Sequence, residues 1–376
     1  MNFENTLNKY KQKLIYHDLN RHIKPIRNSY QYFIVIPVLN ELEYLFKTLN
    51  SINNQNSELL KKTLIVIVIN NRVDSSIHIK KNNRLTYEKI KKCNFEFEYI
   101  TLDYFSNGNE LSVKKYGVGV ARKIGMDYCL QFATGNSLLF SLDADTLISK
   151  SYLQLITKYY HSSNFNTCIV KFLHQKSSNP KIEKAIRLYE DILYDIAYKI
   201  KQCNSPYGYV SMGSTIICKV KAYIAVGGMP QKSAAEDFYF MQSLAKFSKI
   251  NFLNKNLVYP SPRLETRVHL GTGFRMLQYN KNDKFIDLSF TDRCYDSLKK
   301  LIDFVDSHYK ISYNLFIKEL NKNFDYNICN FLSEHNFENI WDKINNNAGS
   351  KKQFLIFFHQ WFDGLKIMKF LKYMNK

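Results

Sequence analysis

Short apolar runs alternate with amphipathic segments in the first 150 positions of the chain. The runs Phe33–Leu39, Leu64–Ile69 and Leu138–Leu142 are continuous and uncharged. Such runs are typical of strands that are buried on both faces of a parallel sheet. The alternation of apolar and charged residues over Phe95–Ile100 indicates one more strand.

Helical periodicity fills intervals between these strands. Glu41–Ile52 and the segment from Gly117 to Phe132 carry apolar residues three and four positions apart. Strands that alternate with helices in this order predict an α/β fold, with a doubly wound and mostly parallel central sheet flanked by helices.

The pattern changes after about residue 150. Pro180 opens a long amphipathic helix, and a further helix begins near Glu236. Residues 253–275 are expected to be mainly loop. From about residue 284 the spacing is helical, and Asn345–Asn347 are expected to form a loop before the last helix.

The chain has 376 residues, of which 45% are hydrophobic. This is enough for a large α/β core with an extension. The patterns predict a helical lead-in (1–29), two halves of one α/β domain (30–148 and 149–280) and a helical C-terminal extension (281–376).

Cysteine usage and the amino terminus indicate a cellular compartment. The seven cysteines are scattered and form no C-x-x-C pair, so we expect reduced thiols, not a disulfide framework or a zinc site. Met1–Asn5 lacks the apolar core of a secretory signal, and the longest apolar runs are too short to span a bilayer. These features predict a cytoplasmic protein.

The chain is strongly basic, with 53 Lys and Arg residues against 33 acidic ones and a formal charge of +20. A solvated surface of biased composition, an anionic substrate, an anionic membrane face and nucleic acid all fit this charge. The segment Phe354–Tyr373 mixes aromatic residues with lysine. It can pack on the rest of the protein, which we favour, or make peripheral contact with an anionic membrane at its inner face.

Asp143-Ala144-Asp145 directly follows a predicted buried strand. The carboxyl ends of strands are where open α/β sheets bind ligands. If the segment stays extended, the two carboxylates point the same way, with only a small alanine between them. Mg²⁺ typically takes one or two carboxylates together with phosphate oxygens and water. The triplet therefore predicts a divalent cation held with nucleotide phosphates.

Glu236-Asp237 begins a predicted helix. Acidic residues in a first helical turn are favoured by the helix dipole, which explains the pair without any catalytic role. The alternative is that one carboxylate, Asp237, faces a cleft and takes a proton from a sugar hydroxyl as general base.

Six short motifs occur in a fixed order between residues 30 and 275. They are Pro37–Glu41, Gly119–Gly125, Asp143–Asp145, Gly213–Thr215, Gly227–Pro230 and Glu236–Asp237. Together they resemble the pattern of glycosyltransferase family 2, bacterial type, on a GT-A fold. The resemblance implies inverting transfer of a sugar from a nucleotide diphosphate sugar to an acceptor hydroxyl, usually with Mg²⁺ or Mn²⁺. It also implies that 30–148 binds the donor and 149–280 the acceptor.

The resemblance implies a role for each matching residue. Asp237 is the implied base, with Glu236 beside it, and Asp143 and Asp145 are implied metal ligands. The implied acceptor is a growing surface glycan, a lipid-linked saccharide or a small anionic molecule. The implied donor-binding residues are Pro37, Asn40, Glu41, Asn70, Asn71, Arg122, Asp143, Arg263 and Arg267.

Two regions of the chain bear on nucleotide binding: the segment after the second strand and the late loop. After the second strand, where many family members carry acidic residues, this chain has Asn70-Asn71, which leaves open the base that is read. In the late loop, Arg263 or Arg267 could grip the departing diphosphate, whose charge grows in the transition state. His269 is a candidate third metal ligand, although a loop histidine satisfied by hydrogen bonds is the simpler interpretation.

Other functions stay open at this point. A retaining transferase shares the D-x-D triplet, and a nucleotidyltransferase shares a similar nucleotide-binding half, although the Gly-rich basic loop expected after its first strand is replaced by Pro37–Glu41. A nucleic-acid-binding protein fits the charge and the aromatic residues. The basic residues are spread along the chain without a recognisable nucleic-acid motif, so we expect no specific nucleic-acid partner.

Overall fold

The computed structural model describes residues 3–12, 14, 25–114, 116–232, 234–265, 271–286, 288–324 and 326–375. These residues form two compact units, each with its own core. The first unit contains residues 1–187 and 211–284, and the second contains 188–210 and 285–376. Helix α7 (Pro180–Gln202) contributes residues to both.

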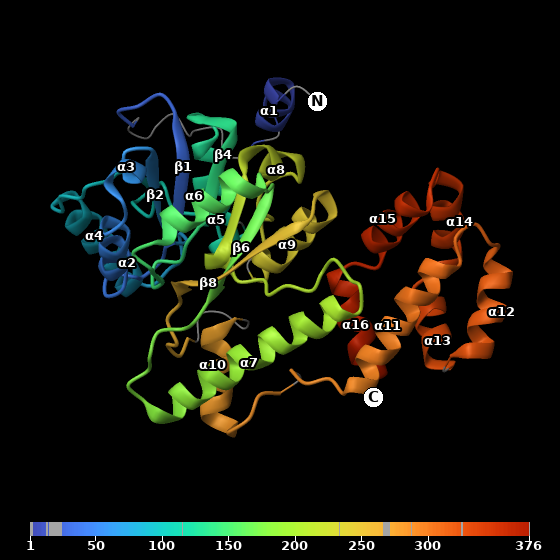
Figure 1. The fold of residues 1–376 in the computed structure, drawn as a ribbon. Coiled ribbons are helices and arrows are strands. Elements are labelled where there is room, and N and C mark those ends of the chain that lie inside the picture. Colours follow the sequence, from blue (N-terminus) through green and yellow to red (C-terminus); the bar gives the residue numbers. More distant parts are fainter. Residues whose placement is uncertain are drawn as a thin grey trace. The chain divides into compact units, whose positions relative to one another are not determined.

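An eight-stranded mixed sheet forms the centre of the first unit (Figure 1). Its order is β3-β2-β1-β4-β7-β6-β8-β5, and β7 and β5 run antiparallel to the strands beside them. The strands are β1 (Tyr30–Val38), β2 (Thr63–Asn70), β3 (Glu98–Tyr104), β4 (Ala133–Ser141), β5 (Leu147–Ile148), β6 (Thr167–Phe172), β7 (Ile216–Lys219) and β8 (Ile250–Tyr259).

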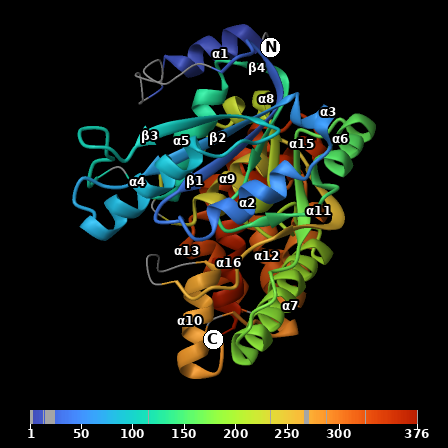
Figure 2. The ribbon, with the colours of Figure 1, turned by 90° about the vertical axis from the view of Figure 1, so that its left-hand side faces the viewer.

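Helices lie on both faces of this sheet (Figures 1 and 2). Besides the amino-terminal part of α7, the helices of this unit are α1 (Phe3–Lys11), α2 (Leu45–Asn53), α3 (Ser57–Leu60), α4 (Ile77–Lys91), α5 (Val118–Cys129), α6 (Tyr152–Ser163), α8 (Val220–Ala225), α9 (Glu236–Phe247) and α10 (Thr272–Asn282). This arrangement confirms the predicted fold class, a mostly parallel α/β sheet flanked by helices.

The central strands are apolar throughout because both of their faces are covered. In β2 every residue is buried, and β1 exposes only Gln31. Helix α5 approaches the sheet very closely, since a Cβ on Gly125 would lie 2.4 Å from Cγ1 of Val35. This contact fixes α5 against β1 and thereby fixes the polar residues that α5 carries toward the end of the sheet.

The second unit is helical and has an aromatic core. Phe316 packs on Trp341 with ring centroids 4.1 Å apart, and the indole nitrogen of Trp341 donates to the carbonyl of Ile311 at 3.0 Å. Besides the C-terminal part of α7, its helices are α11 (Asp292–Ser307), α12 (Tyr313–Asn323), α13 (Tyr326–Glu334), α14 (Phe337–Asn347), α15 (Lys351–Trp361) and α16 (Gly364–Met374). The helical C-terminal extension is thus confirmed.

Several local predictions differ from the structure. The third strand lies at Glu98–Tyr104, later than the predicted Phe95–Ile100. Residues 250–259, expected in part as loop, form β8, whose exposed polar positions hide its strand pattern. Asn345–Asn347 end helix α14 and are not a loop, because tertiary contacts of its apolar face outweigh the low helix propensity of asparagine. The strands β5, β6 and β7 were not predicted from the sequence.

One structural finding concerns whether the chain could span a membrane. Among the helices of the described residues, none is both long and apolar enough to cross a bilayer.

Candidate functional site

Polar residues gather where β1, β2 and β4 end. Asn40 and Glu41 follow β1, Asn70 is the last residue of β2, and Asp143 lies two positions after the end of β4. These three strands are parallel to one another, so their carboxyl ends meet at one edge of the sheet. This is the edge at which the sequence predicts a ligand site.

A buried arginine joins the two acidic motifs. The guanidinium of Arg122, on α5, donates through Nη2 to Asp143 Oδ1 and through Nη1 to Glu236 Oε1. The side chains of Arg122 and Glu236 are 4% and 5% exposed, whereas Asp143 is 33% exposed. We call Arg122, Asp143 and Glu236 the Arg122 cluster. It brings together residues that lie 21 and 114 positions from Arg122 in the sequence.

Two small residues complete this cluster. The hydroxyl of Ser214 donates to Asp143 Oδ2 and accepts from the Asp143 backbone nitrogen at 3.2 Å. A Cβ on Gly213 would lie 2.2 Å from Nη2 of Arg122, so only glycine leaves room for the guanidinium. In the sequence Gly213–Thr215 is one of the six motifs, and nothing there indicates that Gly213 and Ser214 surround an arginine.

The backbone turns sharply just before Glu236. Ala235 has a φ of 58°, in the left-handed region that costs an alanine about 1–2 kcal/mol. Such strain persists where the surrounding structure imposes it, and often where function needs it. Here it begins α9 with Glu236 directed at Arg122, and Asp237 Oδ1 accepts from the backbone nitrogen of Phe238 at 2.7 Å.

Burial shapes the protonation of this acidic pair. Burial raises the pKa of Glu236 to about 7, although Arg122 opposes the shift. Burial also raises the pKa of Asp237. Arg122 and the hydrogen bond from the Phe238 backbone nitrogen both act in the opposite direction and lower this pKa. A carboxyl group with a raised pKa is a stronger base once ionised, which suits proton abstraction near neutral pH.

A second arginine covers Asp145. Arg263 donates through Nη1 to Glu41 Oε2 at 2.8 Å, and its Nε lies 3.1 Å from Asp145 Oδ2. The guanidinium also lies over the ring of Tyr44, with 4.4 Å between Cζ and the ring centroid. Burial raises the pKa of Asp145 to about 7, and Arg263 counteracts that shift. The predicted residues Glu41, Asp145 and Arg263 therefore meet in space.

Asp143 and Asp145 do not lie in one extended segment, contrary to the expectation. The chain turns at Ala144–Asp145, where the Thr146 nitrogen donates to the Asp143 carbonyl at 3.1 Å. Each carboxylate therefore meets a different arginine, Arg122 or Arg263. The two charges still interact, since Asp143 contributes to raising the pKa of Asp145.

An asparagine network supports the ends of β1 and β2. Asn83, buried on α4, accepts from the Asn40 nitrogen and donates to the Asn70 carbonyl and to Asn71 Oδ1, each at 2.9 Å. The side chain of Asn70 donates to the Val38 carbonyl at 3.0 Å. Asn70 and Asn71 are almost fully buried, so the structure places them inside this network. Their predicted contact with a nucleobase stays a prediction, and Asn83 was missed because a buried helix asparagine has no sequence motif.

The oxygen donors at this site fit a hard divalent cation. Asp143 and Asp145 supply carboxylates, the ligand type that Mg²⁺ combines with phosphate oxygens and water. Among the described residues no group of three His, Cys, Asp or Glu side chains could hold a metal by itself. The candidate residues Arg267 and His269 lie outside the described residues.

A pocket of about 570 Å³ opens beside Asp145. Gln175, in its lining, donates from Nε2 to the carbonyls of Asp145 and Tyr259, both at 2.8 Å. The lining residues are Leu147, Leu173, His174, Gln175, Lys176, Glu183, Arg187 and Tyr259.

A second ionic cluster lies further along α5. Asp127 Oδ1 accepts from the hydroxyls of Tyr10 at 2.8 Å and Tyr223 at 2.7 Å, and Lys123 Nζ lies 3.0 Å from Asp127 Oδ2. Burial raises the pKa of Asp127, whereas Lys123 lowers it. We call Asp127, Lys123, Tyr10 and Tyr223 the Asp127 cluster. It attaches helix α1 to α5 and α8.

Comparison with known proteins gives similarity at low identity. No protein-family model and no curated protein sequence matches the chain. Solved structures that are similar include S. aureus TarS 1-349 (16% identity, 61% of this chain and 60% of that chain, TM-score 0.39) and the same protein in complex with UDP-GlcNAc (13%, 92% and 90%, 0.43).

A third similar structure is the mannosyltransferase PcManGT from Pyrobaculum calidifontis, in complex with GDP-Man and Mn²⁺. Its identity to this chain is 11%, the match covers 95% of each chain, and the TM-score is 0.42. The first TarS match spans less than two thirds of that protein's chain. Similarities this low assign neither a substrate nor a metal to this chain.

Proposed function

We propose that this protein is a metal-dependent, inverting glycosyltransferase of the GT-A type and of family 2. It would move a sugar from a nucleotide diphosphate sugar to an acceptor hydroxyl. The observation that carries the proposal is the Arg122 cluster, which joins the carboxylate after β4 to the acidic pair that begins α9. A transferase needs such convergence, because the phosphates of the donor and the base for the acceptor must lie at the same anomeric carbon.

Asp145 and Asp143 would hold Mg²⁺ or Mn²⁺ together with the diphosphate oxygens of the donor. The bound cation would neutralise charge that develops on the departing nucleotide. Asp145 is the better candidate for direct ligation, because both oxygens of Asp143 already accept hydrogen bonds from Arg122 and Ser214.

Asp237 acts as the general base. Its carboxylate takes the proton of the acceptor hydroxyl while the acceptor oxygen forms a bond to the anomeric carbon. The bond from that carbon to the diphosphate oxygen breaks, and its electron pair leaves with the nucleotide. Attack from the face opposite the leaving group inverts the anomeric configuration. Asp237 then returns its proton to water.

Arg263 supplies positive charge on the donor side of the site. Its guanidinium is preorganised by Glu41 and by the ring of Tyr44, so little side-chain entropy is lost when it turns to a phosphate. Arg267 has the same proposed role in the late loop. The nucleoside would lie along Pro37–Glu41 and the asparagine network, and a late ligand to the cation is proposed at His269.

The acceptor is proposed to be a surface glycan, a lipid-linked saccharide or a small anionic molecule. The formal charge of +20 favours acceptors that carry phosphate or acid groups. In this proposal the enzyme works in the cytoplasm, in peripheral contact with an anionic membrane where the acceptor is lipid-linked.

A thermal-shift panel tests the proposal. UDP, GDP, CDP and their sugar conjugates are added to the full chain with and without Mn²⁺. A ligand that binds only the folded form stabilises it by about 2.7 kcal/mol at a hundredfold excess over Kd. We expect one diphosphate to raise the melting temperature only with Mn²⁺, and Asp145→Ala to remove this shift.

Asp342→Ala is the matched control, since Asp342 is an exposed acid of the helical unit. It should keep the full shift. If no diphosphate raises the melting temperature of the folded protein, the proposal is wrong. An unchanged shift in Asp145→Ala would reject the metal-binding role alone, and analysis of the product anomer would separate inversion from retention.

A further inference from the structure

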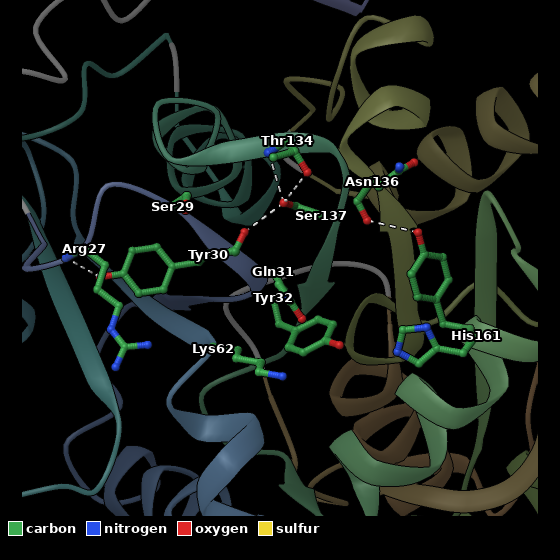
Figure 3. A pocket seen from close by; sticks show the side chains of 11 residues that line it. Arg27, Ser29, Tyr30, Gln31, Tyr32, Lys62, Thr134, Asn136, Ser137 and His161 are labelled. Atoms are coloured by element: carbon green, nitrogen blue, oxygen red, sulfur yellow. Dashed lines mark hydrogen bonds between the residues drawn. The ribbon is translucent and has the colours of Figure 1, made fainter.

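A second pocket, of about 460 Å³, lies at the opposite end of the sheet (Figure 3). It is formed where β1 and β4 begin, beside Lys62 just before β2 and beside Tyr160 and His161 in the last turn of α6. From Tyr32 to Val38, where β1 ends, the strand advances six residues, which corresponds to about 20 Å in extended conformation. A ligand in this pocket would therefore not reach the carboxylates at the other end of the sheet.

The charge of this pocket is one-sided. Arg27, Lys62 and His161 line it, and none of the described residues in its lining is acidic. Lys62 and His161 are exposed, so their side chains can turn toward a ligand. Three basic side chains in the lining favour an anion, although the carboxylate of Glu98, which accepts from the Ile26 backbone nitrogen, lies close to Tyr30.

Tyrosine rings form rigid walls of the pocket. The hydroxyl of Tyr160 donates to the Asn136 carbonyl at 3.1 Å, and its ring packs on Phe165 with centroids 5.2 Å apart. Tyr32 is buried and meets Phe140 edge to face at 6.3 Å. Tyr160 is the half-buried ring of the two, and because these contacts already fix it, it loses little entropy when a flat apolar ligand face packs on it.

Neutral hydrogen-bonding groups complete the lining. Ser137 donates to the Tyr30 carbonyl at 2.8 Å and accepts from the Thr134 nitrogen at 3.0 Å, which fixes the segment in place. Amide and hydroxyl side chains in the lining are those of Ser29, Gln31, Thr134, Asn136 and Ser137. Groups of this kind pair with ligand hydroxyls, which both donate and accept.

We propose that this pocket is a second saccharide-binding site, which holds a glycan segment bearing a carboxylate, phosphate or sulfate. The basic side chains bind the acid group, the Tyr160 ring packs on a sugar face, and the amide and hydroxyl groups pair with sugar hydroxyls. The cavity has room for one or two sugar rings, since small-molecule sites typically measure about 300–1,000 Å³. The choice of a saccharide among anions rests on the proposed transferase function.

Such a site would hold an acceptor chain at a distance from the reaction. A glycan that is bound at the amino ends of the strands stays close to the protein when its other end leaves the reaction site. Rebinding at the reaction site is then an intramolecular step, so the glycan dissociates more slowly between transfers. Single-stranded nucleic acid is the competing occupant, since bases also stack on tyrosine. The pocket favours the saccharide because it is lined by several neutral hydroxyl and amide groups around a small cavity, not by a long basic groove.

Calorimetric titration of the full chain tests this inference. The probes are a chondroitin 4-sulfate disaccharide, lactose as its neutral counterpart, inorganic phosphate and a short oligothymidylate. We expect the acidic disaccharide to bind and lactose to bind at least about tenfold more weakly. Lys62→Glu should weaken the acidic disaccharide by about tenfold or more, because it reverses a charge in the lining.

Lys255→Glu is the matched control, since Lys255 is an exposed lysine of β8 outside the pocket. It should change disaccharide affinity by less than about twofold. The inference is overturned if both variants weaken disaccharide binding equally, or if phosphate binds as tightly as the disaccharide. It is also overturned if the oligothymidylate binds more tightly than the disaccharide and Lys62→Glu weakens the binding of the oligothymidylate.

Two further measurements separate this inference from the proposed function. Asp145→Ala should keep disaccharide binding, and Lys62→Glu should keep the Mn²⁺-dependent shift with the nucleotide. If no nucleotide raises the melting temperature of the wild-type protein but the disaccharide binds in a Lys62-dependent way, the proposed transferase function is wrong. The inference that the pocket binds an acidic ligand would still stand.

Discussion

Helix α5 carries two buried ionic clusters with opposite designs. In the Arg122 cluster one cation meets two carboxylates, and one of these, Asp143, is partly exposed at the edge of the sheet. In the Asp127 cluster one carboxylate meets a cation and two phenols, all of them buried. The first has an excess of negative charge next to solvent, and the second is closed on itself.

This difference separates a site that can take a ligand from one that only holds the fold. A buried acid with enough partners is satisfied and needs nothing further. An acidic cluster with a partly exposed carboxylate can still interact with a cation or an entering substrate. The same helix thus carries the open acidic cluster in its amino-terminal part and attaches α1 further along.

The largest expected effect comes from the base beside the Arg122 cluster. Asp237→Asn should lower the transfer rate by about 10²–10⁴-fold, because the amide cannot take the acceptor proton. Donor binding should stay unchanged, since the side chain keeps its size. Single-turnover transfer and the Mn²⁺-dependent thermal shift measure the two properties. Normal turnover in Asp237→Asn would remove the base assignment.

Breaking either cluster should destabilise the fold by a similar amount. Arg122→Met leaves two acids without their cation, and Asp127→Asn leaves Lys123 without a charged partner. Removal of one partner from a buried ion pair typically costs about 3–5 kcal/mol. Urea unfolding measures the loss in each variant.

The two variants should differ in function. At a temperature where both remain folded, Arg122→Met should abolish transfer, whereas Asp127→Asn should keep it. Equal activity in the two folded variants would contradict the division of roles between the clusters.

Two glycines, one beside each cluster, allow the two clusters to be compared with smaller losses of stability. A Cβ on Gly213 would lie 2.2 Å from Arg122, and a Cβ on Gly228 would lie 2.1 Å from the Tyr10 hydroxyl. Each alanine variant should lose about 1–3 kcal/mol of stability through overpacking, and Gly228→Ala loses more because its φ is +78°. Only Gly213→Ala should also raise KM or lower kcat, as steady-state kinetics at a permissive temperature would reveal.

The smallest effect is a pH dependence of stability from Glu236. Its pKa is raised from 4.5 to about 7 in the folded state, so the folded protein binds a proton that the unfolded chain releases. The stabilisation is therefore complete below pH 4.5 and is lost as the pH rises through 7. Compared with Glu236→Gln, the wild-type protein should lose about 1 kcal/mol or more over this range. Urea unfolding at several pH values measures the difference, and parallel curves would contradict it.

Much of the sheet could be predicted because its central strands obey a simple rule. Strand segments buried on both faces must be apolar, so β1, β2 and the second half of β4, from Leu138, are visible as runs in the sequence. Strand β8, which pairs with β6 and β5, exposes polar residues and was partly taken for a loop. The short strands β5 and β7 lack enough residues to show any period.

The candidate site was predictable in its parts and not in its connections. Asp143, Asp145 and the pair Glu236-Asp237 follow from acidic residues next to strand and helix ends. Their partners do not, since the pairing of Arg122 with Glu236 spans 114 positions and that of Arg263 with Glu41 spans 222. No local pattern records which arginine meets which carboxylate.

The sequence by itself determined the α/β class, the edge of the sheet that carries the acids, and the types of ligand that carboxylates and arginines can take. These properties depend on local periodicity and on side-chain chemistry, which a linear chain displays directly. Only the tertiary structure decided that Asp143 and Asp145 face different arginines, that Asn83 joins the ends of β1 and β2, and that a basic, tyrosine-lined pocket forms at the far end of the sheet. Each of these depends on contacts between residues distant in sequence, which packing of the whole core selects.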